Sequence, residues 1–302
     1  MPQQKRSRKR KKPIAAKKDC VWLEQLVSGT EARNAVKNAP DLKFSFSVDT
    51  SSLGFRKILI SDTTLPTTSS EVTVYKNEGS DFLHVTCGSS NFLVPIQSAF
   101  VISDVSITRQ FVNYGMKFDL IIMDPPWSNK SVKRKKIYGW FDMDDLKALP
   151  ISEILSEDGL LIIWLTNNKV VHENLTRILE HWDLKEVTKW HWLKVTTNGE
   201  PVYPFTPNHK VPFESFAFAC RSNSFCRMKR KIRENFCIIS VPNASHSRKP
   251  PIGPILQQLN TFQWENCLEL YARYLLPKTT SVGFESLKFQ DVYFFNENNK
   301  DN

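Results

Sequence analysis

From residue 98 onward, short continuous apolar runs alternate with amphipathic stretches. The run Phe118–Met123 is apolar or β-branched at nearly every position, as is typical of a strand buried on both faces of a parallel sheet. Further runs predict strands over residues 160–165, 186–193, 215–220, 235–241 and 267–273, and helical spacing predicts helices over 142–155, 169–182 and up to 259. This alternation favours an α/β fold with a parallel, doubly wound sheet.

The first hundred residues have a different pattern. Apolar positions three or four apart predict a helix over 19–39, and short β-prone runs follow at 43–47, 57–60, 71–75 and 82–86. We therefore expect four parts: a disordered basic tail over residues 1–18, a helix with a small β-rich module over 19–97, the main α/β domain over 98–296, and a short tail over 297–302. The module offers no chemistry, so it either positions a ligand or supports the structure.

Charge is concentrated at the N-terminus. The net charge is +10, but nine of the 41 Lys and Arg residues lie in residues 1–18, where there is no acid. The rest of the chain is nearly neutral. Such a basic block is typical of a nuclear localisation signal or a nucleic-acid-binding arm, with a solvated terminus as the alternative.

The six cysteines include no Cys-x-x-Cys pair, and the sequence has no apolar signal segment or run of about 18 apolar residues. No His or Cys pairs with another at metal-ligand spacing. We therefore expect a protein of a reducing compartment, with no membrane span and no metal.

The chemistry is concentrated directly after the 118–123 run, at Asp124, Pro125, Pro126 and Trp127. The two prolines lack an N–H and end the strand, which places a rigid loop at its carboxyl end, where open α/β sheets bind ligands. Carboxylate and carbonyl oxygens beside an indole form an acceptor-only pocket suited to the exocyclic amine of a stacked base. The alternative is a simple strand-ending turn.

Two clusters of basic residues accompany this motif. Residues 130–136 contain five Lys or Arg and precede Tyr138, which suits a loop that binds phosphate and closes over a nucleotide. A second cluster falls between residues 227 and 233. Together they suggest a groove for a polyanion, and the alternative for the first is a solvated loop.

The segment from Phe118 to Trp127 resembles the signature of the eukaryotic adenine-N6 methyltransferases, and residues 128–134 resemble their methyltransferase-like-four branch. The resemblance covers roughly residues 98–295. It implies a Rossmann-like methyltransferase sheet in permuted order, because the Asp-Pro-Pro-Trp motif precedes the strand expected to bind cofactor. It also implies S-adenosylmethionine as cofactor.

The resemblance further implies site residues. Asp124, Pro125, Pro126 and Trp127 would be catalytic. Substrate would be bound by Asn129, Lys130, Lys133, Arg134, Tyr138, Lys210 and Glu214. Cofactor would be bound by Asp104, Val105, Asp124, Lys249, Arg273, Phe284 and Glu285.

Some of these positions have alternatives or depart from the family. Asp104 could instead cap a helix, and Glu214 could be a paired surface acid. Glu269 is a candidate for the cofactor region or a partner for Arg273. Phe284 replaces an asparagine that contacts cofactor hydroxyls in the family, and Arg248 stands where the family usually has histidine.

The resemblance implies methylation of adenine N6 in nuclear RNA, at an internal 2′-O-methyladenosine of a spliceosomal, U2-type small nuclear RNA. Within the same chemistry the alternative substrate is DNA. A different class of function is a catalytically inactive nucleic-acid-binding subunit, since the family includes such partners. We expect an active monomer, with the need for a partner subunit left open.

Overall fold

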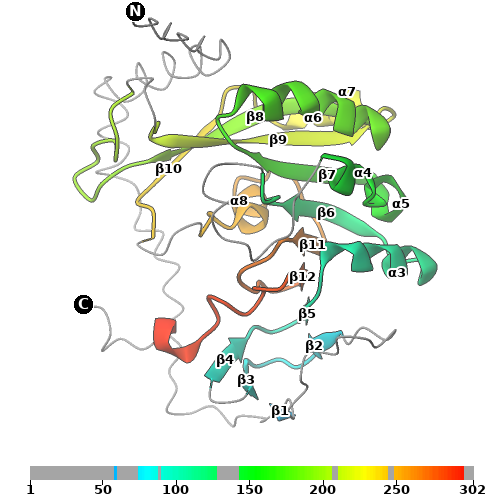
Figure 1. The fold of residues 1–302 in the computed structure, drawn as a ribbon, viewed down its shortest axis with the longest axis vertical. Coiled ribbons are helices and arrows are strands. Elements are labelled where there is room, and N and C mark those ends of the chain that lie inside the picture. Colours follow the sequence, from blue (N-terminus) through cyan, green and yellow to red (C-terminus); the bar gives the residue numbers. More distant parts are fainter. Residues whose placement is uncertain are drawn as a thin grey trace, which may run out of the picture.

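The computed structural model describes residues 58–59, 74–87, 90–127, 143–205, 210–243 and 248–295. The expected tails, the helix over 19–39, the run at 43–47 and the basic loop at 130–136 lie outside these residues. Two sheets make up the described part, one of nine strands and one of three (Figure 1). The nine-stranded sheet follows the order β10-β8-β9-β7-β6-β11-β12-β5-β2.

The strands of this sheet are β2 (Tyr75–Asn77), β5 (Ser98–Val101), β6 (Phe118–Met123), β7 (Leu155–Leu165), β8 (Leu184–Lys194), β9 (Phe213–Arg221), β10 (Cys237–Ser240), β11 (Cys267–Leu270) and β12 (Thr279–Val282). All neighbouring pairs are parallel except those of β9 with β7 and β8, and of β2 with β5. The sheet is therefore mostly parallel, in agreement with the parallel, doubly wound sheet that the sequence predicted, with β9 and β2 as its antiparallel strands. The antiparallel strands interrupt the strand–helix alternation, because β9 follows β8 through a loop and lies between β7 and β8.

Helices cover both faces of the sheet: α3 (Thr108–Asn113), α4 (Met143–Lys147), α5 (Ile151–Ile154), α6 (Lys169–His181), α7 (Phe225–Lys231) and α8 (Ile252–Gln258). Alternate strand residues point to opposite faces. Ile121 and Met123 of β6 join a buried cluster with α3 to α6, whereas Leu120 and Ile122 join a second cluster with α7 and α8. The predicted α/β doubly wound fold is confirmed, with one hydrophobic layer on each side of the sheet.

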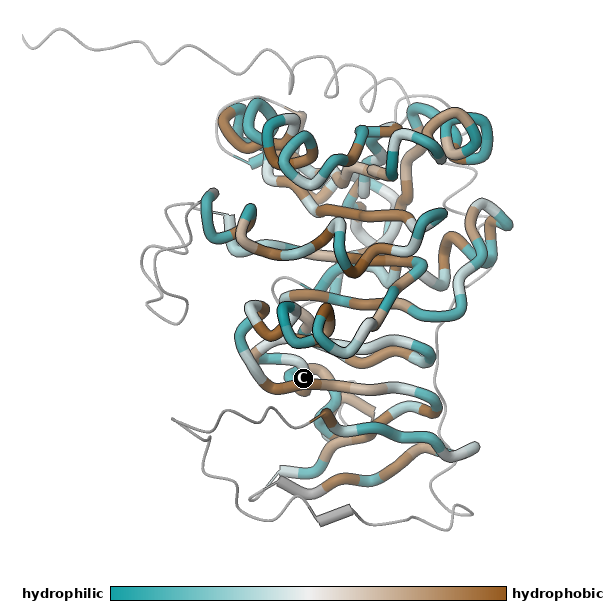
Figure 2. The backbone as a smooth tube through the Cα atoms, turned by 90° about the vertical axis from the view of Figure 1, so that its right-hand side faces the viewer, coloured by the Kyte–Doolittle hydropathy of each residue, from teal (hydrophilic) through white to brown (hydrophobic). Residues whose placement is uncertain are grey.

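Hydropathy along the chain follows this layering. Figure 2 shows apolar residues running along the central strands, and polar residues returning at the turns between them. On β6, all four residues from 120 to 123 are buried, with at most 6% of any of them exposed. This explains why β6 is a continuous apolar run, since a central strand has no solvent-facing side.

The three-stranded sheet contains β1 (Ile58–Leu59), β3 (Leu83–Cys87) and β4 (Ser90–Val94) in the order β1-β3-β4. Its residues Val85 and Val94 pack in one cluster with Phe100, Leu275 and Leu287 of the main domain. Two 3₁₀ turns complete the elements, η1 (Val105–Ile107) and η3 (Val292–Phe295). Because β2 also pairs with β5, the segment before residue 98 completes the edge of the large sheet. The domain boundary at residue 97 stays a prediction.

Candidate active site

The strand order reverses between β6 and β11. From β6 the chain moves to its neighbour β7, whereas from β11 it moves in the opposite direction to β12. In open α/β sheets a crevice forms at such a reversal, outside the carboxyl ends of the strands. Asp124 directly follows β6, and Tyr271 directly follows β11 with a positive φ of 60°. A left-handed residue other than glycine is strained, and here it turns the chain at the point where the strand order reverses. We refer to the region at the carboxyl ends of β6 and β11 as the crevice.

The Asp-Pro-Pro-Trp turn is fixed by two hydrogen bonds. The Trp127 backbone N–H donates to the Pro125 carbonyl at 2.7 Å, which closes a tight turn. The Trp127 indole Nε1–H donates to the Trp164 carbonyl at 2.7 Å. Only 3% of Trp127 is exposed. The indole therefore anchors the turn to β7, and its stacking on a base stays a prediction that would require the ring to leave the core.

A chain of alternating charges connects Asp124 to β8. Lys249 Nζ lies 3.2 Å from Asp124 Oδ2 and 2.7 Å from Glu214 Oε2. The other oxygen of Glu214 is paired with Lys194, the last residue of β8. This polar chain runs Lys194–Glu214–Lys249–Asp124, and all four side chains are largely shielded, with 13–27% of each exposed. Two acids and two bases therefore balance within it.

Two tryptophan rings lie under the cations of this polar chain. Lys249 Nζ is 5.3 Å from the centroid of Trp164, and Lys194 Nζ is 4.5 Å from that of Trp192. The two rings meet edge to face with their centroids 6.1 Å apart. A cation over an indole face is stabilised by the ring quadrupole. The pair of rings thus fixes where both ammonium groups can lie.

Burial and charge have opposite effects on the pKa values of Glu214 and Lys249 in the polar chain. Burial alone would raise the pKa of Glu214, but the charges of Lys249 and Lys194 lower it below its ordinary value. Burial alone would lower the pKa of Lys249, but Asp124 and Glu214 raise it. Both groups are therefore charged at neutral pH, and each is kept charged by its partners.

A further acid lies beneath the crevice. Glu269 of β11 is 9% exposed, and burial followed by the charge of Asp124 raises its pKa to about 8. Tyr274 forms a side-chain hydrogen bond with it, which partly offsets the rise in pKa. Arg273, the partner considered for Glu269 from the sequence, is paired with Glu285 instead. Glu269 was considered from the sequence as a candidate for the cofactor region, whereas Lys194 was not among the expected site residues. A carboxylate inside the buried strand 267–270 was the available signal for Glu269.

Apart from Asp124 and Lys249, the expected cofactor residues follow the carboxyl ends of β5, β11 and β12. Arg273 Nε is 3.2 Å from Glu285 Oε2, and Lys288 Nζ is 2.6 Å from Glu285 Oε1. Phe284 is half exposed. Gly283 is in close contact with the chain after β11: a Cβ at this position would lie 2.9 Å from the Ala272 carbonyl oxygen. Glycine therefore allows the two loops to meet.

The segment after β5 has a structural role. The Asp104 side chain accepts a hydrogen bond from the Ser106 N–H at 2.9 Å and caps η1, as the alternative interpretation proposed. Val105 is buried. In this structure Asp104 is exposed, and its contact with cofactor stays a prediction.

The expected substrate residues are only partly described. Glu214 belongs to the polar chain, and Lys210 is exposed with Nζ 5.3 Å from the centroid of Tyr203. Arg248 lies over the Phe289 ring, 5.5 Å from its centroid. The remaining expected residues lie outside the described part of the chain: Asn129, Lys130, Lys133, Arg134 and Tyr138.

The described part of the chain contains neither a candidate metal site nor a candidate membrane span. No group of three or more His, Cys, Asp or Glu side chains there could hold a metal ion. None of the helices in those ranges combines the length and apolarity that a membrane crossing requires.

Comparison with known proteins supports the resemblance. The MT-A70 family model matches residues 118–285. A "DNA N6-methyl methyltransferase" of Caenorhabditis elegans is 40% identical over 211 residues, which is 69% of this chain and 57% of the relative. The "N(6)-adenine-specific methyltransferase METTL4" of Homo sapiens is 35% identical over 233 residues, 74% of this chain and 48% of the relative.

A third relative is the "N6-methyladenosine RNA methyltransferase MTA1" of Pyricularia oryzae, 34% identical over 213 residues, 66% of this chain and 55% of the relative. The chain thus spans about half the length of the curated relatives it matches. The family match begins at the first residue of β6 and ends at Glu285, so it includes the Asp-Pro-Pro-Trp turn, the polar chain and the crevice. The family expected from the motifs is confirmed: this chain belongs to the MT-A70 family.

Proposed function

We propose that this chain transfers a methyl group to the exocyclic N6 of an adenine in nucleic acid. The observation that carries the proposal is the placement of Asp124, at the carboxyl end of β6 in the crevice, with one oxygen held by Lys249 at 3.2 Å. An adenine amine is a poor nucleophile, because its lone pair is delocalised into the ring. Two acceptors for its hydrogens favour a more tetrahedral, more reactive nitrogen.

Asp124 provides the first acceptor and the Pro125 carbonyl the second. That carbonyl already accepts from Trp127, but a carbonyl oxygen has two lone pairs and can accept a second hydrogen bond. The amine becomes acidic only after it has been alkylated. Asp124 therefore does not need to act as a strong base, and water can take the proton.

Methyltransferases of the MT-A70 family generally use S-adenosylmethionine, which supplies the methyl group when bound. The residues of the crevice fit this cofactor. Gly283 allows the loops that carry Arg273 and Glu285 to pack against each other, and Glu285 and Arg273 offer an acceptor and donors for hydroxyls or carboxylate. The half-exposed ring of Phe284 offers a flat surface for a base where the family has an amide. Lys249 remains the candidate for the methionine carboxylate.

For the substrate we propose nuclear RNA, at an internal 2′-O-methyladenosine of a U2-type spliceosomal small nuclear RNA. The support is the methyltransferase-like-four resemblance of residues 118–134 and the basic block in residues 1–18. One relative is named as an RNA methyltransferase. Another is named as a DNA methyltransferase, which makes DNA adenine the second candidate substrate. We propose that the chain acts in the nucleus and as a monomer.

The decisive experiment measures methyl transfer to four matched oligonucleotides: RNA with and without a 2′-O-methyl group on the target adenosine, the corresponding DNA, and RNA with the target changed to guanosine. Transfer to the 2′-O-methylated RNA above the other three supports the proposal. Preference for DNA would contradict the proposed RNA substrate but would still support methyl transfer to adenine N6.

Calorimetric titration with S-adenosylmethionine separates the enzyme from an inactive nucleic-acid-binding subunit. Saturable binding together with methyl transfer supports the enzyme. Absence of cofactor binding in a protein that still binds RNA would favour the inactive subunit.

A further inference from the structure

The second basic cluster of the sequence lies far from the catalytic turn. Because β9 is antiparallel to β7, its last residue lies beside the start of β7, where Arg221 Nη2 donates to the Leu155 carbonyl at 3.2 Å. Helix α7 follows β9 and therefore sits at the amino-terminal edge of the parallel strands. Asp124 lies at the opposite edge. The second basic cluster thus lies at the edge opposite the crevice, and the groove that the sequence suggested for the two clusters stays a prediction, since residues 130–136 lie outside the described part of the chain.

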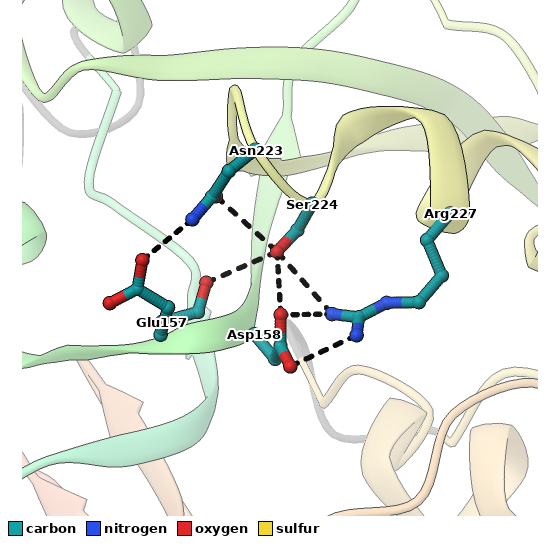
Figure 3. Close-up of polar contacts among 5 residues, drawn as sticks. All are labelled: Glu157, Asp158, Asn223, Ser224 and Arg227. Atoms are coloured by element: carbon teal, nitrogen blue, oxygen red, sulfur yellow. Dashed lines mark hydrogen bonds and ion pairs between the residues drawn. The ribbon is translucent and has the colours of Figure 1, made fainter.

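A set of polar contacts fixes the start of α7 on β7 (Figure 3). Ser224 Oγ donates to Asp158 Oδ1 at 2.8 Å, and Arg227 Nη1 donates to Asp158 Oδ2 at 2.9 Å. Asn223 Nδ2 donates to Glu157 Oε1 at 2.6 Å. Arg227 is therefore committed to Asp158, and its charge is balanced.

The buried side of α7 adds to this attachment. Met228 and Ile232 are each 1% exposed and pack in the cluster under α8. Lys229 is paired with Glu234 and donates to the Val187 carbonyl at 3.1 Å. The helix is thus held on both sides, and two of its basic residues, Arg227 and Lys229, stabilise its attachment to the sheet.

Three cations remain at the end of α7: Arg230, Lys231 and Arg233. We refer to them as the α7 cluster. All three are exposed, and within the described residues none of them is in an ion pair. Like charges this close repel each other, and a firmly attached helix keeps them together. Phosphate groups bound there would neutralise the three cations and relieve the repulsion between them.

A cavity of about 440 Å³ adjoins the α7 cluster. Lys231 lines it together with Asn260, Thr261 and Gln263, from the turn that follows α8. Two acids also line it, and both have partners within the protein: Asp158 is paired with Arg227, and Asp119 accepts hydrogen bonds from Ser156 and from the backbone of residues 265 and 266. Amide, hydroxyl and ammonium groups are the donors that proteins use for phosphate and sugar. In contrast, protein interfaces are built around an apolar centre, and no large apolar side chain is exposed between residues 222 and 234. The chemistry favours nucleic acid over an acidic protein.

The spacing fits a continuous substrate. Asp119 lines the same cavity, and β6 leads from it to Asp124 in five residues. At roughly 3.3 Å per residue, this is about 17 Å. Because β6 is buried, a nucleic acid must follow the surface and cover more than this straight-line distance. Stacked nucleotides rise by roughly 3.4 Å each, so the cavity lies at least about five nucleotides from the catalytic turn.

We propose that the α7 cluster binds the phosphate backbone of the nucleic-acid substrate at least about five stacked nucleotides from the target adenine. The proposal rests on the proposed function, because it needs a nucleic acid in the crevice. It makes α7 a site of length-dependent affinity: short substrates occupy only the crevice, and longer ones also reach the cluster.

The test compares the Arg230→Glu/Lys231→Glu/Arg233→Glu variant with a control that reverses three exposed cations on other elements, Lys76→Glu/Arg177→Glu/Lys185→Glu. Binding of fluorescent RNA of about 20 and about 5 nucleotides is measured over a range of salt concentrations. We expect at least about 10-fold weaker binding of the long RNA to the α7 variant, with a smaller loss for the short RNA. The salt slope should fall by about 2, because each single-strand phosphate contact contributes roughly 0.7.

Equal losses in the α7 variant and the control, or a loss that does not depend on RNA length, would overturn the α7 proposal. Circular dichroism and thermal melting confirm that both variants are folded. Failure of the proposed function gives a different result, since the unmodified chain would then methylate neither RNA nor DNA. An unmodified chain that methylates RNA beside an α7 variant with unchanged binding would overturn the α7 proposal alone.

Discussion

Lys249 Nζ lies 3.2 Å from Asp124 Oδ2, so one oxygen of the acid in the Asp-Pro-Pro-Trp turn is held by the loop that leads into α8. This contact orients the carboxylate through that oxygen. It also links the turn to Glu214 and Lys194, because Lys249 bridges the two acids. The acceptor geometry at Asp124 is therefore set by side chains from three other segments.

Asp124→Ala should reduce methyl transfer by roughly 100- to 1,000-fold or more, because it removes a positioned acceptor for the amine. The fold should survive, since Lys249 keeps Glu214 as its partner. Initial rates and thermal melting test the two parts. Asp144→Ala is the control, since Asp144 is an exposed acid paired with Lys147 on α4. A rate close to that of the unmodified chain would refute the role of Asp124.

Lys249→Met should lower the free energy of unfolding by about 3 kcal/mol, because Asp124 and Glu214 would be left as shielded charges without their shared cation. Adding Glu214→Gln should recover part of that loss by removing one of the two charges. Urea unfolding of the single and double variants measures both effects. A double variant no more stable than Lys249→Met would contradict the pairing.

Lys194→Met should shift the acid limb of the pH–rate profile to higher pH. Glu214 would lose one of the two cations that lower its pKa, and would be protonated sooner as the pH falls. Because its folded-state pKa lies below the ordinary 4.5, its stabilising effect is complete above about pH 4.5 and is lost as the pH falls through the folded pKa. Lys194→Arg should restore the profile. An unchanged acid limb in Lys194→Met would show that Lys194 does not act through Glu214.

Glu269→Gln should change how stability depends on pH. The pKa of Glu269 is raised to about 8 in the folded chain from an ordinary 4.5. Between these values the folded state retains a proton that the unfolded state has lost, so stability falls as the pH rises. Removing the titration should flatten this fall, and the variant should gain in relative stability from pH 5 to pH 8. Chemical unfolding at both pH values measures the effect. Parallel pH curves for variant and parent would argue against the raised pKa.

Gly283→Ala should weaken S-adenosylmethionine binding. The added Cβ would lie 2.9 Å from the Ala272 carbonyl oxygen and 3.0 Å from its nitrogen, so the loops carrying Arg273 and Glu285 must move apart. Overpacking of this kind costs about 1–3 kcal/mol. Gly115→Ala is the control: its φ of +64° is strained for alanine, but a Cβ there has open space. Calorimetric titration should show weaker binding only for Gly283→Ala, and equal affinities would contradict the role of the loops.

The sequence was sufficient to predict the elements that carry strong local patterns. The run 118–123 became β6, the alternation from 160 to 220 became β7, α6, β8 and β9, and the Asp-Pro-Pro-Trp turn lies at the end of β6. These predictions succeeded because burial on both faces leaves a continuous apolar signal. The direction of β9 was not predictable in the same way, since an antiparallel buried strand has the same apolar pattern as a parallel one.

The polar chain could not be predicted from local sequence patterns. Lys194, Glu214 and Lys249 come from three segments, and only the sheet order brings them together with Asp124. Lys194 is the residue after the run 186–193 that predicted this strand. The burial of Trp127 was also not predictable from its motif, because it depends on a hydrogen bond to the distant Trp164.

Strand β9 begins at the catalytic edge, with Glu214 as its second residue, and ends at the opposite edge, just before the turn into α7. It is hydrogen-bonded to β7 on one side and to β8 on the other, so it cannot slide or stretch. The distance between its two ends is therefore fixed by the number of residues in the strand. Side-chain changes can tune the strength of either end, but only an insertion or deletion within β9 can change how far apart they are.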